Sequence, residues 1–276
     1  MQKSISRKFL ETAQSDLSAA RLLHQNEAFP HAIFSLQQSI EKTIKAVGLQ
    51  VGLISFDELR TKRIGHNAFR LSAISAKAMA EQTKSVLQLI EAKHPVLEFL
   101  PAMPKKDFQE YLDKLRSSEA KIGSIQPTEY REPSDEELLK LFQAFQTTSE
   151  ISFEFVPEEL RDFLDLWLDN ISQKNLIAQN EIDELKMAFS DFKNIHLMID
   201  AVQKAVRIEI WFAQILIPLS IITSAHESDS RYPCAECGHH PTEYYQKGLP
   251  IVDHFEELAE WQSKCLEVIQ QFIDNK

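Results

Sequence analysis

Residues 9–47 have the sequence FLETAQSDLSAARLLHQNEAFPHAIFSLQQSIEKTIKAV, and this stretch decides the fold. Apolar residues recur every three or four positions on both sides of a very short connection, as one face of an α-helix requires. The first periodic segment covers residues 4–27, and the second covers residues 30–50, with Pro30 at the favoured first turn. Because the connection is so short, the two segments predict a pair of antiparallel, packed helices.

The remainder of the chain also favours helices. Only 6 glycines occur, no glycine-rich nucleotide-binding motif is present, and one short alternating segment at residues 152–156 resembles a strand. Ser134 and Glu137 have the spacing of a capping box at the start of a helix. We therefore expect an all-α fold, with further helical patterns at residues 66–93, 105–122, 134–149, 158–172, 180–225 and 251–273.

The composition is that of a globular chain with an acidic surface. Hydrophobic residues make up 43% of the 276 residues, and the formal net charge is -11. Such a charge repels phosphate, so any nucleic-acid site must be small and local. The N-terminus lacks an apolar signal core, and three cysteines are too few for a disulfide framework, which favours the cytoplasm. Residues 210–225 are strongly apolar but short for a membrane span, so we expect a buried core helix and no membrane partner.

Three stretches share a pattern with one known family. The predicted hairpin carries QQSIEKTIKA at residues 37–46, KRIGHNAFRL occupies residues 62–71, and SRYP at residues 230–233 precedes the closing helix. These stretches are similar to segments of the HEPN family, and the resemblance covers roughly half the chain. It implies an up-and-down helical bundle built from both ends of the chain.

The resemblance implies a division of the chain into three parts. Residues 1–94 would form the N-terminal part of the bundle, and residues 201–276 would form its C-terminal part. Residues 95–200 would be a helical insertion, because more than a hundred residues separate His66 from Arg231, whereas short family members keep the matching segments close. Acidic residues dominate part of this insertion, which is interpreted as a solvated surface or a face that binds a partner.

The resemblance also implies a catalytic pair. Catalytic HEPN proteins are metal-independent endoribonucleases whose motif is an arginine, four to six residues, then a histidine. Arg60 and His66 have five residues between them and fit this motif. A histidine can take or give a proton near neutral pH, and a guanidinium can hold two oxygens of a phosphate.

The local sequence around the pair departs from the family pattern. Many catalytic members have Asn, Asp or His directly after the arginine, whereas this chain has Thr61, and Asn67 follows His66 instead. Lys62 and Arg63 would add a local positive field for RNA binding. The alternative interpretation is that His66 only begins a helix and that the basic cluster is a solvated loop.

Three further residues are candidates for the site. Glu41 would orient a basic group or line a polar pocket of the bundle; alternatively it forms an ordinary helix pair or a buried salt bridge. For its neighbour Lys42 a structural pair is favoured. Arg231 and Tyr232, from the SRYP segment, are predicted to contribute to binding.

A cysteine–histidine segment offers a separate prediction. Cys234, Cys237, His239 and His240 lie in CAECGHH, in which two thiolates and one or two imidazoles have the spacing of zinc ligands. His226 or His254 would complete a four-ligand structural site. The alternative is a reduced dithiol in a polar loop. Cys265, in the last helix, is expected to be a small buried apolar residue.

Three functions follow from these patterns. The first is a HEPN endoribonuclease of a toxin–antitoxin or phage-defence system, acting on RNA without a catalytic cofactor and as a homodimer. The second is a non-catalytic HEPN module that binds a nucleotide or a partner protein, such as a nucleotidyltransferase acting as antitoxin. The third is a helical scaffold without a ligand.

Overall fold

The computed structural model describes residues 2–52, 54–60, 132–150, 179–190, 207–208, 210–233 and 240–274, together with single positions between 74 and 120. Within these residues the secondary structure is entirely helical, which confirms the all-α prediction. The elements in chain order are α1 (Gln2–Gln25), α2 (Phe29–Gln50), α3 (Phe56–Arg60), α6 (Asp135–Ser149), α8 (Gln179–Ser190), η3 (Phe212–Leu216), α10 (Ile217–Ser224), α11 (Pro241–Tyr244), α12 (Pro250–Asp253) and α13 (Phe255–Asp274).

The turn between α1 and α2 explains the tight hairpin. Glu27 has a φ of 59°, in the left-handed region that ends many helices. The N–H of Ala28 donates to the carbonyl of Leu23 at 2.9 Å, and the N–H of Glu27 donates to the carbonyl of His24 at 2.9 Å. This hydrogen-bond pair is the Schellman motif, and Pro30 then lies in the first turn of α2, where no N–H is needed.

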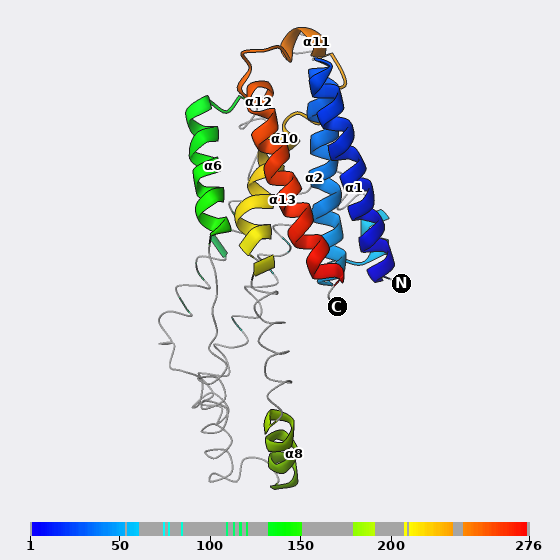
Figure 1. The fold of residues 1–276 in the computed structure, drawn as a ribbon, viewed down its shortest axis with the longest axis vertical. Helices are drawn as coiled ribbons and strands as arrows, with labels where there is room; N and C mark the ends of the chain where they lie inside the picture. The colour runs from blue at the N-terminus through cyan, green and yellow to red at the C-terminus, as the bar shows by residue number, and fades with distance from the viewer. Residues whose placement is uncertain are drawn as a thin grey trace. The chain divides into compact units, whose positions relative to one another are not determined.

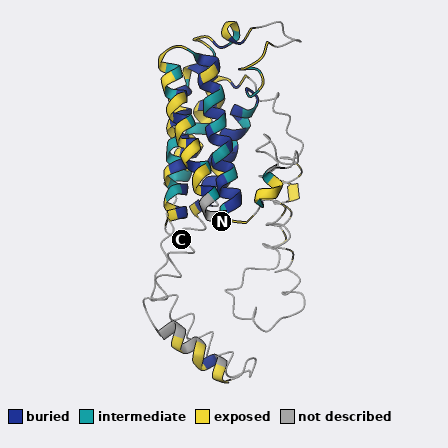
Figure 2. Cartoon of the chain, turned by 90° about the vertical axis from the view of Figure 1, so that its right-hand side faces the viewer, coloured by how far each residue is buried: buried dark blue, intermediate teal, exposed yellow. Residues whose placement is uncertain are grey.

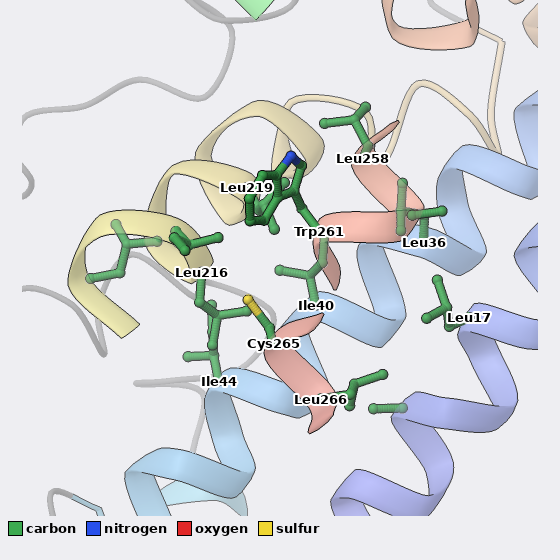
Figure 3. Close-up of a cluster of buried hydrophobic side chains, with 14 of the residues drawn as sticks. Leu17, Leu36, Ile40, Ile44, Leu216, Leu219, Leu258, Trp261, Cys265 and Leu266 are labelled. Carbon is green, nitrogen blue, oxygen red and sulfur yellow. The ribbon is translucent and has the colours of Figure 1, made fainter. Parts of the chain in front are cut away.

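The last helix packs on this hairpin, so the two ends of the chain form one core. Figure 1 shows α13 alongside both α1 and α2, with the two termini at the same end, where Arg7 pairs with Asp274. In Figure 2 the bundle helices carry a buried side and an exposed side. Figure 3 shows Leu17 of α1, Ile40 of α2 and Cys265 of α13 in the same apolar cluster. The predicted packing of the hairpin against the closing helix is thus present.

The apolar segment before the closing helices forms a helix with a local widening. η3 is a π-helix, in which the N–H of Ile217 donates to the carbonyl of Phe212. Pro218 follows at once, in the first turn of α10. Because proline lacks an N–H and its ring crowds the carbonyl four residues earlier, a wider turn relieves the conflict. Apart from this turn, residues 210–224 form the expected buried core helix.

Helix α6 comes from the segment expected to be the insertion, yet it packs on the bundle. Its start confirms the capping-box prediction, because Ser134 and Glu137 exchange both hydrogen bonds. Phe145 is fully buried, with its ring 5.5 Å from that of Trp261. His254, just before α13, approaches Asp135 through Nε2 at 3.2 Å.

The chain divides into two compact units. The first comprises Met1–Ala78, Ser117–Ile151 and Ile208–Lys276 and holds the bundle. The second comprises Met79–Arg116 and Ser152–Arg207 and contains α8, in which Ile182 is buried. Within the described part of the chain, no helix has both the length and the apolar character that a membrane crossing needs.

Candidate functional site

Glu41 lies at the centre of a buried polar cluster on α2. It is 3% exposed, and Lys45 donates to its Oε1 over 2.5 Å. Its Oε2 accepts from the side-chain amides of Gln37 at 3.3 Å and Gln38 at 3.5 Å, and Gln38 also donates to Gln37 at 2.7 Å. A buried carboxylate needs such donors, since an unpaired charge is costly inside a protein. The motif residues 37, 38, 41 and 45 thus act as one hydrogen-bonded group.

Lys42, beside Glu41 in sequence, has a different role. Its ammonium group pairs with Asp16 of α1, and both side chains are about one quarter exposed, at 23% and 25%. This ion pair joins α1 to α2 and favours one register of the hairpin. Lys42 is therefore a structural residue of the hairpin, as favoured from the sequence.

Arg60 ends the short helix α3, directly after the hairpin. Gly52 has a φ of 75°, which lets the chain turn away from α2. Ser55 accepts from the N–H of Glu58 at 3.2 Å and donates its own N–H to the Glu58 carboxylate at 2.7 Å, so α3 starts with a reciprocal cap. The side chain of Arg60 lies outside the described residues, as do Lys62, Arg63, His66 and Asn67.

A compact turn follows α10 and carries the SRYP residues. The N–H of Ser230 donates to the carbonyl of His226 at 3.1 Å, and the N–H of Tyr232 donates to the carbonyl of Ser228 at 3.0 Å. His226 is fully buried, with its Nδ1 2.9 Å from the hydroxyl of Tyr245. The turn is therefore stabilised by backbone hydrogen bonds within residues 226–232 and by the buried hydrogen bond between His226 and Tyr245.

Arg231 connects this turn to α2. Its guanidinium carbon lies 4.7 Å from the ring centroid of Phe34 and 5.1 Å from that of Tyr232. Both distances are within the range of cation–π attraction. Its Nε donates to the carbonyl of Glu227 at 3.0 Å, and the Glu227 carboxylate is 3.5 Å from Nη2.

The two candidate regions share one face of α2. Phe34, Gln38, Glu41 and Lys45 follow each other at helical spacing, so Phe34 begins the stripe that the polar cluster continues. The sequence prediction missed Phe34, although its spacing from Gln38 and Glu41 marked the same face. The structure thus places Phe34, whose ring contacts Arg231, on the same stripe as Glu41, two turns away along α2.

The predicted metal ligands are only partly described. Cys234, Cys237 and His239 lie outside the described residues. His240 caps α11, with its Nδ1 2.8 Å from the Thr242 hydroxyl, so Nε2 is the atom that remains for a metal. In the described ranges, no group of three His, Cys, Asp or Glu residues is arranged to hold a metal ion.

The two flanking histidines, His226 and His254, interact with neighbouring side chains, and Cys265 is buried. His226 contacts Tyr245, and His254 lies between the carboxylates of Asp135 and Glu257, at 3.2 and 3.4 Å. Cys265 is a buried free thiol, as expected, and the loss of solvation raises its pKa well above the ordinary value. These groups have structural environments, and we expect the buried Cys265 thiol to be unreactive in the folded chain.

Together these features describe an all-α bundle protein whose first hairpin carries a buried charged cluster. Comparison with family models identifies it further: the HEPN domain model matches residues 6–61. This part of the chain is therefore similar to the HEPN domain, in agreement with the resemblance. The match covers most of α1 and all of α2 and α3, and it includes Arg60, while His66 and the SRYP segment follow it. Neither the curated proteins nor the solved structures contain a match to the chain.

Proposed function

We propose that this protein is a metal-independent endoribonuclease of the HEPN type, cytoplasmic and homodimeric, in a toxin–antitoxin or phage-defence system. The HEPN match carries the proposal, because it runs through Arg60, the first residue of the Arg–His motif. The homodimer is part of the proposal because HEPN sites are completed across a two-fold axis.

The proposed reaction is cleavage by the neighbouring 2′-oxygen of the RNA. That oxygen loses its proton to a base and bonds to phosphorus, while the bond from phosphorus to the 5′-oxygen breaks and this oxygen takes up a proton. The products are a cyclic phosphate and a 5′-hydroxyl. His66 serves a proton-transfer step, and Arg60 stabilises the negative charge on the phosphate.

Other residues have supporting roles in this proposal. Glu41 is a positioning residue, because its carboxylate is buried and engaged with Lys45 rather than exposed to a substrate. Asn67, next to His66, orients the imidazole or the phosphate. Lys62 and Arg63 increase the local attraction for RNA. This positive charge at the site offsets the repulsion between RNA and the acidic chain.

Paired substitutions test the proposal. His66→Ala and Arg60→Ala should each remove RNA cleavage by the purified protein, and also its growth toxicity, while a chelator leaves cleavage by the natural chain unchanged. His31→Ala and Arg7→Ala are the matched controls, because both residues are exposed on the first two helices. Cleavage that survives both His66→Ala and Arg60→Ala would rule out this site.

The charge of the chain favours a second candidate function. A net charge of -11 opposes RNA binding, and α6 begins with three acidic residues, Asp135, Glu136 and Glu137. The second proposal is therefore a non-catalytic HEPN module that binds a nucleotide or a nucleotidyltransferase-type antitoxin. It predicts that the purified natural chain cleaves no RNA and forms a stable complex with a nucleotidyltransferase encoded beside it.

A structural zinc ion is a separate proposal. Cys234, Cys237 and His239 would bind it, with His240 contributing through Nε2 so that its cap on α11 is kept. Metal analysis of the purified chain should find one zinc per protein, and Cys234→Ser should remove it. Absence of bound zinc from the natural chain, purified without chelators, would refute the site.

A further inference from the structure

We propose that Arg231, Tyr232 and Phe34 form a subsite that binds one unpaired nucleobase of single-stranded RNA, away from the phosphate that is cleaved. This inference rests on the proposed function and extends it, because it names the form of RNA that the chain accepts. Three observations support it: an exposed aromatic ring, a cation stacked against that ring, and a hydrogen-bonded turn that carries both.

The Tyr232 ring is available for stacking. Tyr232 is 60% exposed, whereas Tyr245, which anchors the same turn, is 1% exposed. Arg231 lies over the Tyr232 ring, and its own side chain is 36% exposed. A base can stack on the face of this ring that Arg231 does not cover, while the cation on the opposite face holds the ring in place.

The subsite is already organised before a ligand binds. Phe34 supports the guanidinium from α2, and the backbone bonds of residues 226–232 hold the turn. His226 and Tyr245 pin it to the core through a bond of 2.9 Å. Because little side-chain freedom is lost on binding, more of the stacking energy becomes affinity.

Arg231 can also contact the RNA backbone. Its Nε and Nη2 are directed to Glu227, and Nη1 makes no hydrogen bond to the described residues. A phosphate beside the stacked base would accept from Nη1 in a charge-assisted bond. Only a few phosphates would be neutralised, so the logarithm of the affinity should change with the logarithm of salt by about −0.7 per phosphate.

The subsite is distinct from the proposed cleavage site. α2 extends about 24 Å from Phe34 to Gln50, and α3, which carries Arg60, begins only beyond that far end. Tyr232 therefore holds a nucleotide several positions from the cleaved bond. Its loss should raise KM for RNA and leave kcat close to that of the natural chain.

Duplex RNA is excluded by the same geometry. Its bases are stacked on each other and cannot cover the Tyr232 ring, whereas an unpaired base offers a free face. The matched probes are therefore a short oligoadenylate with methylated 2′-oxygens, which cannot be cleaved by the proposed reaction, and the same strand annealed to its complement.

The test measures binding of both probes to the full chain. Tyr232→Ala should weaken single-strand binding about tenfold, and Tyr232→Phe should stay within about twofold, because the ring is kept. Arg231→Ala should weaken it and reduce its salt dependence, while Arg7→Ala, whose arginine also pairs with a carboxylate on the surface, should have no effect. The duplex should bind more weakly than the single strand to the natural chain.

The outcomes separate this inference from the nuclease proposal. If Tyr232→Ala binds the single strand as the natural chain does, if the duplex binds equally well, or if neither probe binds, the subsite is refuted. If binding depends on Tyr232 but the natural chain cleaves no ordinary RNA, the subsite stands and the nuclease proposal fails. Loss of cleavage in His66→Ala with binding retained supports both.

Discussion

The buried amide of Gln262 joins the closing helix to the opening hairpin, and its removal tests that packing. Gln262 is fully buried in α13, and its Nε2 donates to the hydroxyls of Ser39 at 2.9 Å and Thr43 at 2.8 Å. Ser39 donates in turn to the carbonyl of Ala13 in α1 at 2.8 Å. Three helices from opposite ends of the chain thus share one polar network.

The network also defines which side of the amide faces the hydroxyls. Thr43 donates its hydroxyl hydrogen to the carbonyl of Ser39 at 2.8 Å, and Ser39 donates to Ala13, so both hydroxyls can only accept from Gln262. Oε1 of Gln262 consequently points elsewhere, without a hydrogen-bond partner in the described part of the chain. Gln262→Met removes two useful bonds and also one unsatisfied oxygen, and these effects on stability oppose each other.

The coupling energy is therefore the informative quantity. Gln262→Met, Thr43→Val and the double substitution form a cycle in which the single bond of 2.8 Å is isolated. A buried hydrogen bond contributes about 1 kcal/mol net, so we expect a coupling of about 1 kcal/mol. Thr12→Val is the matched control, because Thr12 also donates to a helix carbonyl at 2.8 Å but is exposed.

Urea denaturation followed by far-UV circular dichroism and by tryptophan fluorescence measures these free energies. The Gln262→Met and Thr12→Val substitutions should be additive within about 0.3 kcal/mol. A coupling between Gln262 and Thr43 that is equally small would show that α13 does not hydrogen-bond to α2 at this point. The packing of the two chain ends described above would then be wrong in register or in partner.

Four further predictions concern α6 and the last cysteine. Ser134→Ala should destabilise the docked α6 by about 1 kcal/mol through loss of the cap, as measured by urea denaturation. Hydrogen bonds from the backbone and hydroxyl of Ser134 lower the pKa of Glu137. The Glu137 carboxylate should therefore stabilise the fold fully above the ordinary carboxyl pKa, and this contribution should decline as the pH falls through the lowered value. Glu137→Gln should remove this acid dependence of stability, and an unchanged pH profile would contradict the cap. Phe145→Ala should lower the free energy of unfolding by about 3–5 kcal/mol because it leaves a cavity. Leu139→Ala, at an exposed position of the same helix, should change it by less than about 0.5 kcal/mol. Equal effects of the two substitutions would contradict the docking of α6. Cys265 should resist thiol reagents in the native chain and react only after denaturation, so rapid native labelling, mapped by mass spectrometry, would contradict its burial.

Much of the bundle could be predicted because its signals are local. The helical period of residues 9–47, Pro30 at a helix start and the Ser134–Glu137 cap each depend on residues within a few positions of one another. The π-turn at η3 was not predicted, because its cause is Pro218 within a helix that the surrounding core maintains. In the structure the helix continues through Pro218 with one widened turn before it.

The candidate site was predictable only as a set of motifs. The sequence marked Glu41, Arg231 and Tyr232 separately, and the spacing of Arg60 and His66 rests on the family pattern. It did not indicate that Arg231 stacks on Phe34, because these residues are almost two hundred positions apart. It left open whether Glu41 is buried or exposed, since an EK pair on a helix is usually exposed, and the structure shows that it is buried.

The sequence by itself determined the helical class, the hairpin and the HEPN match of residues 6–61, because helix periodicity, caps and motifs depend on neighbouring residues. The packing of α13 on that hairpin was expected from the resemblance, whereas only the tertiary structure decided that α6 also completes the core. An apolar helix face does not by itself specify which other face it packs against. The partner depends on shape and on the few buried polar groups that need hydrogen bonds. Gln262, Ser39 and Thr43 are such groups, and their hydrogen bonds join the two ends of this chain.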